Sequence, residues 1–226
     1  MQKPIPNRQN TASREKLIET AKELFYQQGY NATTLAQISD ASSINNGLIT
    51  YYFGSKCNLA SEIYTAFILE MRNEIARQLF EIKKGYKLEL GVAVETRFML
   101  AIKFENENLM RFYTEYYKER DSFSEINEKR EHYYKLQKRL INSSISDIDL
   151  KLYEVCGISI MNGIADAYAN QYLDHDSVYI EDYAIRMLYT MLQLPPYQVE
   201  ALIDESRYLK KMMKIKVGPG FRLMTV

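Results

Sequence analysis

The sequence predicts an all-α protein in which a small N-terminal helical domain precedes a larger helical bundle. Through most of the chain, apolar residues recur at the three- and four-residue spacing of amphipathic helices. Residues that commonly begin helices, Ser, Thr, Asn and Asp, precede most of these apolar runs. Strands are not expected, because the period-two alternation of a half-buried strand is missing after residue 88. The chain has 226 residues, of which 46% are hydrophobic, so it can form a packed core without disulfides.

The first helix is expected over residues 14–28, with Ser13 as its N-cap and Gly29 just past its end. Its apolar positions share one face: Leu17, Ile18, Ala21, Leu24 and Phe25. Residues 1–12 contain two prolines among polar residues, which predicts a flexible arm. Lys3 and Arg8 would let such an arm reach a DNA minor groove. Simple fraying is the alternative.

Residues 33–56, TTLAQISDASSINNGLITYYFGSK, predict two short helices joined by a tight turn. Thr34 and Gln37 fit a capping box, so the first of these helices should begin near Leu35. The polar run of residues 40–43 reads as the turn, after which Asn45 can cap a second helix over residues 46–53. This order of elements predicts a helix-turn-helix.

The outward face of the second helix should carry polar, aromatic and small side chains, with no carboxylate among them. These residues are Asn46, Gly47, Leu48, Thr50, Tyr51 and Tyr52. Amides, hydroxyls and phenols can meet base edges and phosphate oxygens when a helix lies in the major groove. A glycine inside so short a helix costs about 1 kcal/mol against alanine, which indicates close backbone approach to another molecule.

At these positions the chain resembles the TetR/AcrR family of bacterial transcriptional regulators. The family signature is matched in order by Thr34, Ile38, Ile44, Gly47, Ile49, Tyr52, Phe53, Ser55 and Lys56. Asn45 stands where Ser is common, and Thr50 where Tyr is common. The resemblance implies that Thr34, Tyr52 and Lys56 contact the sugar-phosphate backbone. The full set expected at DNA is Thr34, Asn45, Asn46, Gly47, Leu48, Thr50, Tyr51, Tyr52 and Lys56.

We expect the helix-turn-helix domain to span residues 13–58 and a helical domain to span residues 59–226. A helix over residues 56–82 should link the two, because its apolar positions continue past the first domain. Further helices are expected over residues 88–104, 107–120, 124–142, 148–173, 178–194 and 197–214.

The middle of the chain is rich in Met and aromatic residues, which suit either a bundle core or an adaptable pocket with a few polar groups. The family resemblance implies that this domain binds a small, often apolar or amphipathic effector. The residues expected to line the effector pocket are Phe98, Met99, Met110, Tyr113, Tyr117, Tyr134, Cys156 and Met161.

Residues 148–173 contain many small residues, including Gly157, Ser159 and Gly163, which permit close packing against another helix. The resemblance implies that this helix and the one over residues 178–194 pair with their mates in a homodimer. Packing inside a monomer is the alternative. The expected interface anchors are Ile158, Ile164, Tyr183 and Met187.

Composition and charge narrow the possible functions. The formal net charge is zero, but residues 1–58 carry six basic and four acidic residues, a weak positive bias at the expected DNA-binding end. A basic cluster between Arg207 and Arg222 reads either as a solvated helix end or as a DNA or partner contact. Two distant cysteines and the absence of a leader or a long apolar run predict a cytoplasmic protein. No catalytic or metal-binding motif occurs, so we expect no enzyme activity, cofactor or metal.

The sequence therefore predicts a homodimeric repressor that a small, largely apolar effector releases from a palindromic operator. Two alternatives stay open at this point. One is a DNA-bound architectural or partner-binding regulator without a small-molecule ligand, which would have a filled core. The other is an enzyme, which would need reactive groups that converge in the helical pocket.

Overall fold

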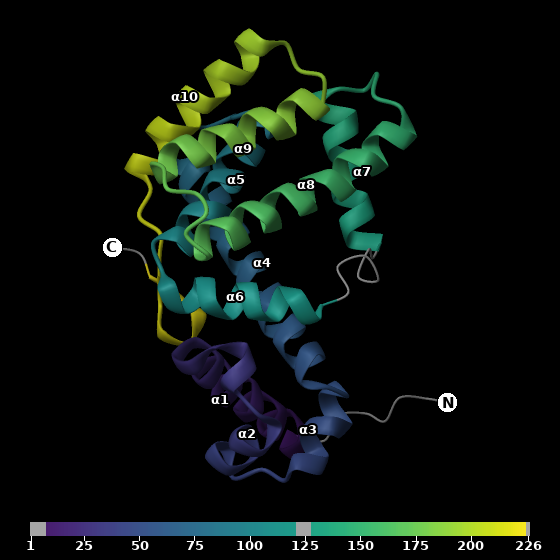
Figure 1. Ribbon diagram of the computed structural model, residues 1–226. Helices are drawn as coiled ribbons and strands as arrows, with labels where there is room; N and C mark the ends of the chain where they lie inside the picture. Colours follow the sequence, from purple (N-terminus) through teal and green to yellow (C-terminus); the bar gives the residue numbers. More distant parts are fainter. Residues whose placement is uncertain (1–7, 121–127, 225–226) are drawn as a thin grey trace.

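The computed structural model describes residues 8–120 and 128–224 and confirms the all-α prediction. Within these residues, helices α1 to α3 form a compact unit at one end, and the other helices form a bundle at the other end (Figure 1). Helix α4 runs from the small unit into the bundle. The helices are α1 (Arg8–Ala32), α2 (Leu35–Ser42), α3 (Asn46–Phe53), α4 (Lys56–Ile82), α5 (Leu88–Phe104), α6 (Glu107–Glu119), α7 (Glu128–Ile141), α8 (Asp147–Ala169), α9 (Ser177–Met191) and α10 (Pro196–Met212).

Several helix boundaries agree with the sequence analysis, but those of the first helix do not. Helices α3, α4 and α5 have the predicted bounds. Helix α1 begins at Arg8, six residues before the predicted start, so part of the expected flexible arm is helical and residues 1–7 lie outside the described residues. Gly29 interrupts the helix as expected, with a φ of 85° that favours glycine.

Local capping explains why the small unit folds as two short helices around a turn. Thr34 accepts a hydrogen bond from the backbone N–H of Gln37, and the Gln37 side chain accepts one from the Thr34 N–H, so the capping box is complete. Ser43 ends α2 in a left-handed conformation, and the Asn45 side chain caps α3 by accepting from the Gly47 N–H at 2.7 Å.

One apolar core connects the small unit to the bundle. Phe25 of α1, Ile38 of α2 and Ile49 of α3 are buried in it, with at most 1% of each exposed. The buried face of α4 continues the same core through Leu59, Ile63, Phe67, Met71 and Ile75. A second cluster lies between α5, α8, α9 and α10. Helix α4 is therefore packed at both ends, as its sequence predicted.

The expectation that the chain has no strands is wrong at the C-terminal end. Strands β1 (Lys216–Gly218) and β2 (Arg222–Met224) form an antiparallel pair around a 3₁₀ turn, η1 (Pro219–Phe221). This hairpin runs back from α10 to α1 (Figure 1). Three-residue strands are too short for a period-two pattern to be seen in the sequence.

Candidate functional site

The outer face of α3 is open to solvent at five of the six predicted positions, and Tyr52 is half-buried against the core. Ile49 and Phe53 are buried, while Asn46, Gly47 and Thr50 are exposed. Two larger side chains share the open face, Leu48 at 37% exposure and Tyr51 at 65%. The face thus offers amide, hydroxyl, phenol and apolar groups on a helix whose other side is fixed by the core.

Three of the residues expected at DNA have structural partners inside the protein. Thr34 and Asn45 are helix caps. The Lys56 ammonium donates to the Tyr30 carbonyl at 3.0 Å and lies 4.0 Å from the Tyr30 ring centroid. Lys56 therefore holds the start of α4 against the end of α1, a contact that sequence analysis did not foresee.

The bundle contains a cavity of about 350 Å³, a volume within the range of small-molecule pockets. Its walls come from α4, α5, α6, α7, α8 and α9 and combine apolar side chains with phenols. Of the eight residues expected to line an effector pocket, five line this cavity: Met99, Tyr113, Tyr117, Tyr134 and Met161.

The other three predicted pocket residues do not line the cavity. Phe98 and Met110 are packed in the apolar core instead, with 3% and 7% exposure. Cys156 is half-buried beside the cavity-lining Gly157. Neighbouring positions on a helix point about 100° apart, so an aromatic or sulfur-rich sequence does not tell which residue of an adjacent pair faces inward.

Sequence analysis missed the charged groups of the cavity. Lys103 of α5 lines it with only 3% of its surface exposed, and Arg72, Glu95 and Arg120 also line it. The Arg72 guanidinium and the Glu95 carboxylate are paired at 2.5 Å. Burial lowers the pKa of the Lys103 ammonium to about 7. A lysine in an apolar helix pattern gives no sequence signal that it will be buried.

Hydrogen bonds orient the tyrosines at the cavity wall. The Tyr113 hydroxyl contacts the Asn162 side chain of α8, which is 6% exposed. The Tyr153 hydroxyl donates to the Gln137 side-chain oxygen at 2.9 Å. Burial raises the pKa of both Tyr113 and Tyr153, so both phenols stay neutral at ordinary pH.

Helix α6 lies between the cavity and the small N-terminal unit. On one side of α6, Tyr113 and Tyr117 line the cavity. From its other side the Glu119 carboxylate accepts a hydrogen bond from the Tyr30 hydroxyl at 2.6 Å, and the Glu115 carboxylate accepts one from the Asn31 N–H at 2.7 Å. The same element therefore contacts both candidate sites.

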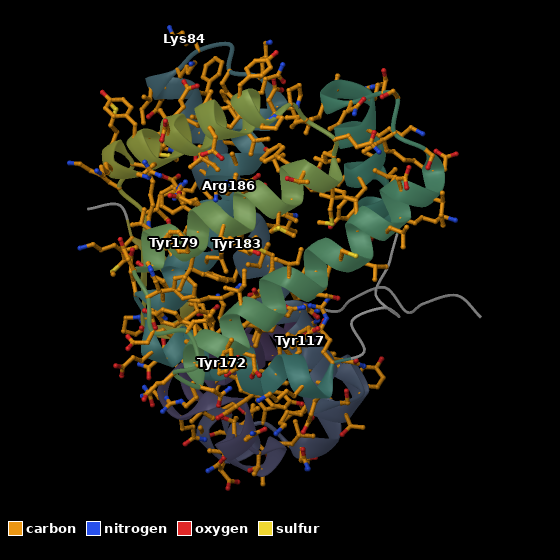
Figure 2. All side chains as sticks on the ribbon, turned by 45° about the horizontal axis from the view of Figure 1, so that its top comes forward. Lys84, Tyr117, Tyr172, Tyr179, Tyr183 and Arg186 are labelled. Atoms are coloured by element: carbon orange, nitrogen blue, oxygen red, sulfur yellow. The ribbon has the colours of Figure 1, made fainter. Side chains whose placement is uncertain are left out.

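Helices α8 and α9 present a partly apolar outer face. Tyr179 and Tyr183 are about half exposed on α9, and they lie near Arg186 on the face where the two helices run side by side (Figure 2). Of the expected dimer anchors, Tyr183 is exposed, Ile164 and Met187 are half-buried, and Ile158 lines the cavity. The outer face of α8 includes Gly163, where an added Cβ would meet nothing within 4 Å.

The described residues hold neither a cluster of metal-binding side chains nor a membrane-spanning helix. No group of three or more His, Cys, Asp or Glu residues there could hold a metal ion. No helix within residues 8–120 and 128–224 is both long enough and apolar enough to cross a bilayer.

Sequence comparison identifies relatives of the N-terminal part. The family described as bacterial regulatory proteins, tetR family, matches residues 17–63. The HTH-type transcriptional regulator QacR of Staphylococcus aureus is 31% identical over 121 residues, which is 51% of this chain and 60% of QacR. The probable acrEF/envCD operon repressor of Escherichia coli is 40% identical over 52 residues, 23% of this chain and 24% of that protein. The chain thus matches at most about three fifths of the length of these relatives.

Solved structures share the fold over most of the chain. The TetR regulator TylP of Streptomyces fradiae superposes with a TM-score of 0.51 at 18% identity, covering 86% of this chain and 98% of TylP. NalD, the secondary repressor of the MexAB-OprM multidrug efflux pump in Pseudomonas aeruginosa, superposes with a TM-score of 0.50 at 13% identity, covering 81% of this chain and 97% of NalD. At these identities the likeness concerns the fold alone.

Proposed function

Because this chain belongs to the TetR family of bacterial transcriptional regulators, we propose that it is a homodimeric repressor released from its operator by a small effector. The observation that carries the DNA-binding part is the open face of α3, whose opposite side is packed in the core. A fixed helix with a polar outer face can enter a major groove without refolding. In bacteria such a protein works in the cytoplasm, where the chromosome lies.

Two copies would place two α3 helices against one duplex. The face of α8 and α9 around Tyr183 and Gly163 supports this pairing, because it combines exposed aromatic groups with room for close helix approach. A two-fold dimer reads a palindrome whose half-sites lie about one helical turn apart.

The cavity supports the effector part over the alternative of a regulator with a filled core. Its volume, its phenol and apolar walls and its few charged groups suit a small amphipathic molecule. Helix α6 carries both cavity residues and the contacts to α1, so a ligand that moves α6 would change the position of the small unit. The protein would act by binding alone, with no catalysis.

Selection from a pool of random duplexes tests the DNA-binding part. We expect the wild-type protein to enrich an inverted repeat, and Tyr51→Ala to bind the enriched duplex about tenfold or more weakly. The matched control is Tyr197→Ala, because Tyr197 is 73% exposed on α10, away from α3. Sedimentation of the free protein should show a dimer.

Two outcomes would contradict the role of α3 in DNA recognition. If no sequence is enriched, or if Tyr51→Ala and Tyr197→Ala bind the enriched duplex equally, α3 is not the recognition element. A monomer that binds a single half-site would contradict the dimer but leave the role of α3 intact.

A further inference from the structure

The charged groups in the cavity wall point to the class of the effector, an inference that rests on the proposed function. Lys103 lies near the C-terminal end of α5 and is 97% buried, as only 3% of its surface is exposed. Its ammonium lies 3.9 Å from the centroid of the Tyr113 ring. Among the described residues no carboxylate pairs with it. Burying an ammonium without a partner raises the free energy of the folded protein, so a negatively charged group in the cavity would be stabilised there.

The remaining charges of the wall do not supply that negative charge. Glu95 is the acidic residue in the cavity lining, and its two oxygens are used by Arg72 at 2.5 Å and by the Tyr133 hydroxyl at 3.4 Å. Arg120 also lines the cavity and has contacts of its own within the protein. With Arg72 and Glu95 offsetting each other, the cavity is positive whenever Lys103 is protonated.

The other side chains of the cavity wall suit a ligand with an apolar, flat ring system. Tyrosine rings from four helices surround the cavity, together with aliphatic and thioether side chains. These residues are Tyr64, Ile68, Met99, Tyr113, Tyr117, Tyr133, Tyr134, Tyr153, Ile158 and Met161. Aromatic side chains contribute large apolar contact areas and prefer stacked or edge-on partners.

We propose that the effector is an amphipathic organic anion whose acidic head contacts the Lys103 ammonium and whose apolar, ring-containing body packs between the cavity tyrosines. The ammonium would gain a charge-assisted hydrogen bond that none of residues 8–120 and 128–224 supplies. A cation held by the tyrosine rings is the competing occupant. Lys103 disfavours that occupant by placing a positive charge inside the same cavity.

Three probes with one body and different heads test the proposal. They are 2-naphthoate, 2-naphthalenemethanol and 2-naphthylmethylammonium, titrated by fluorescence into the full-length protein without DNA. At pH 6 we expect naphthoate to bind about tenfold or more tightly than the alcohol, and the ammonium probe to bind most weakly. The preference is overturned if the ammonium probe binds most tightly, or if naphthoate fails to bind at millimolar concentration.

Two substitutions assign the preference to Lys103. Lys103→Met removes the charge and keeps an unbranched side chain, so the preference for naphthoate over the alcohol should disappear. Lys103→Arg keeps the charge and should keep the preference. If Lys103→Met leaves the affinity for naphthoate within twofold of wild type, Lys103 does not hold the acidic head.

The pH dependence gives a second readout. Burial sets the pKa of Lys103 near 7, so the wild-type preference for naphthoate should decline between pH 6 and pH 9 as the ammonium deprotonates. Arginine stays charged, so Lys103→Arg should keep its preference at pH 9. A preference in the wild type that stays constant over this range would contradict the role of the ammonium.

Five other ionisable groups of the cavity are expected to contribute little to that pH dependence. Burial raises the pKa of Tyr64, Tyr113, Tyr133 and Tyr153, and the pKa of Arg72 is also raised, so these groups keep one charge state from pH 6 to pH 9. The remaining ionisable groups that face the cavity are Glu95 of α5, Tyr117 of α6, Arg120 just after α6, and Tyr134 of α7.

Thermal unfolding controls for the integrity of Lys103→Met. Because the pKa of Lys103 is lower in the folded protein than in the unfolded chain, the protonated lysine destabilises the fold most below pH 7. The variant should therefore unfold at a higher temperature than wild type, and by a larger margin at pH 6 than at pH 9.

The outcome separates this inference from the proposed function. If naphthoate binds through Lys103 but leaves the enriched duplex bound, the anionic site stands and release by this class of effector fails. If instead a cationic compound binds in the cavity and releases the duplex, the proposed function stands and the anionic class is wrong.

Discussion

A single buried arginine connects three helices of the bundle. The Arg97 guanidinium of α5 has no exposed surface and pairs with Asp182 at 2.7 Å and with Glu181 at 3.1 Å, both on α9. It also contacts Ser206 of α10 through two of its nitrogens. Lys210 pairs with the other oxygen of Glu181 at 3.0 Å. The position of α9 therefore depends on buried ion pairs that its two carboxylates, Glu181 and Asp182, form with basic groups of α5 and α10.

Removing the arginine should destabilise the protein strongly. Arg97→Met would remove one cationic partner from each of two buried carboxylates, a loss of about 3–5 kcal/mol in the free energy of unfolding. Urea unfolding followed by circular dichroism measures the loss. The control is Lys83→Met, because Lys83 pairs with Glu205 at the surface and should contribute about 1 kcal/mol or less. Equal losses in the two variants would contradict the importance of burial.

The C-terminal hairpin is an element whose role depends on one aromatic residue. The Phe221 ring lies within 6.0 Å, centroid to centroid, of rings on three helices: Tyr26 of α1, Phe67 of α4 and Phe112 of α6. Arg222 beside it pairs with Glu23 of α1 at 2.9 Å. The Asn106 side chain donates to both the Tyr26 hydroxyl and the Val217 carbonyl. The hairpin thus fastens the small unit to the bundle.

Truncating that ring should loosen this junction. Phe221→Ala removes a side chain that is 2% exposed, and we expect a loss of about 3–5 kcal/mol in the free energy of unfolding. Met224→Ala on the same hairpin is the control, because Met224 is 44% exposed and its loss should change stability by about 0.5 kcal/mol. Chemical denaturation compares the two. A loss below about 1 kcal/mol for Phe221→Ala would show that the hairpin only rests on the surface.

Helices with their own caps were the elements that sequence predicted best. Ser55 caps α4 and Asn106 caps α6, and the predicted starts of both helices are correct because each cap is set by residues within four positions. The hairpin lacks such local signals. The basic cluster between Arg207 and Arg222 predicts a solvated helix end or a DNA or partner contact, whereas Lys210 of α10 and Arg222 of β2 pair with acidic groups of α9 and α1.

At the scale of the whole molecule, the contact between α1 and α6 should transmit the effect of a ligand. The Tyr30 hydroxyl donates to the Glu119 carboxylate, and the Tyr30 carbonyl accepts from Lys56 at the start of α4. Tyr30 therefore touches both elements that lead from the bundle to the small unit. A ligand can shift DNA affinity only by the difference in its affinity for the two conformations.

We expect Tyr30→Phe to weaken coupling without abolishing either binding event. In the wild type, saturating 2-naphthoate should lower the affinity for the enriched duplex by about 5- to 150-fold. The variant keeps the ring and loses the hydroxyl, so this ratio should fall while the affinity for each ligand alone stays within a few-fold. Anisotropy titrations with and without naphthoate measure it. Tyr172→Phe, at a position 84% exposed, should keep the wild-type ratio, and an unchanged ratio in Tyr30→Phe would remove Tyr30 from the coupling route.

The sequence by itself determined the helices, their order and the outward face of α3. These features depend on capping and on the spacing of apolar residues, which act within one or two turns. It also indicated the cavity region, because five of its predicted lining residues do face the cavity.

Only the tertiary structure decided which charges are buried and what they meet. Lys103, Arg97 and Lys56 look alike as basic residues in helical segments, yet one lines a cavity, one joins three helices and one holds two helix ends together. The hydrogen-bond partners of Lys56 and Arg97 stand 26 to 109 positions away along the chain. No local pattern encodes such pairings, because the electrostatic environment of a side chain exists only once distant helices have packed around it.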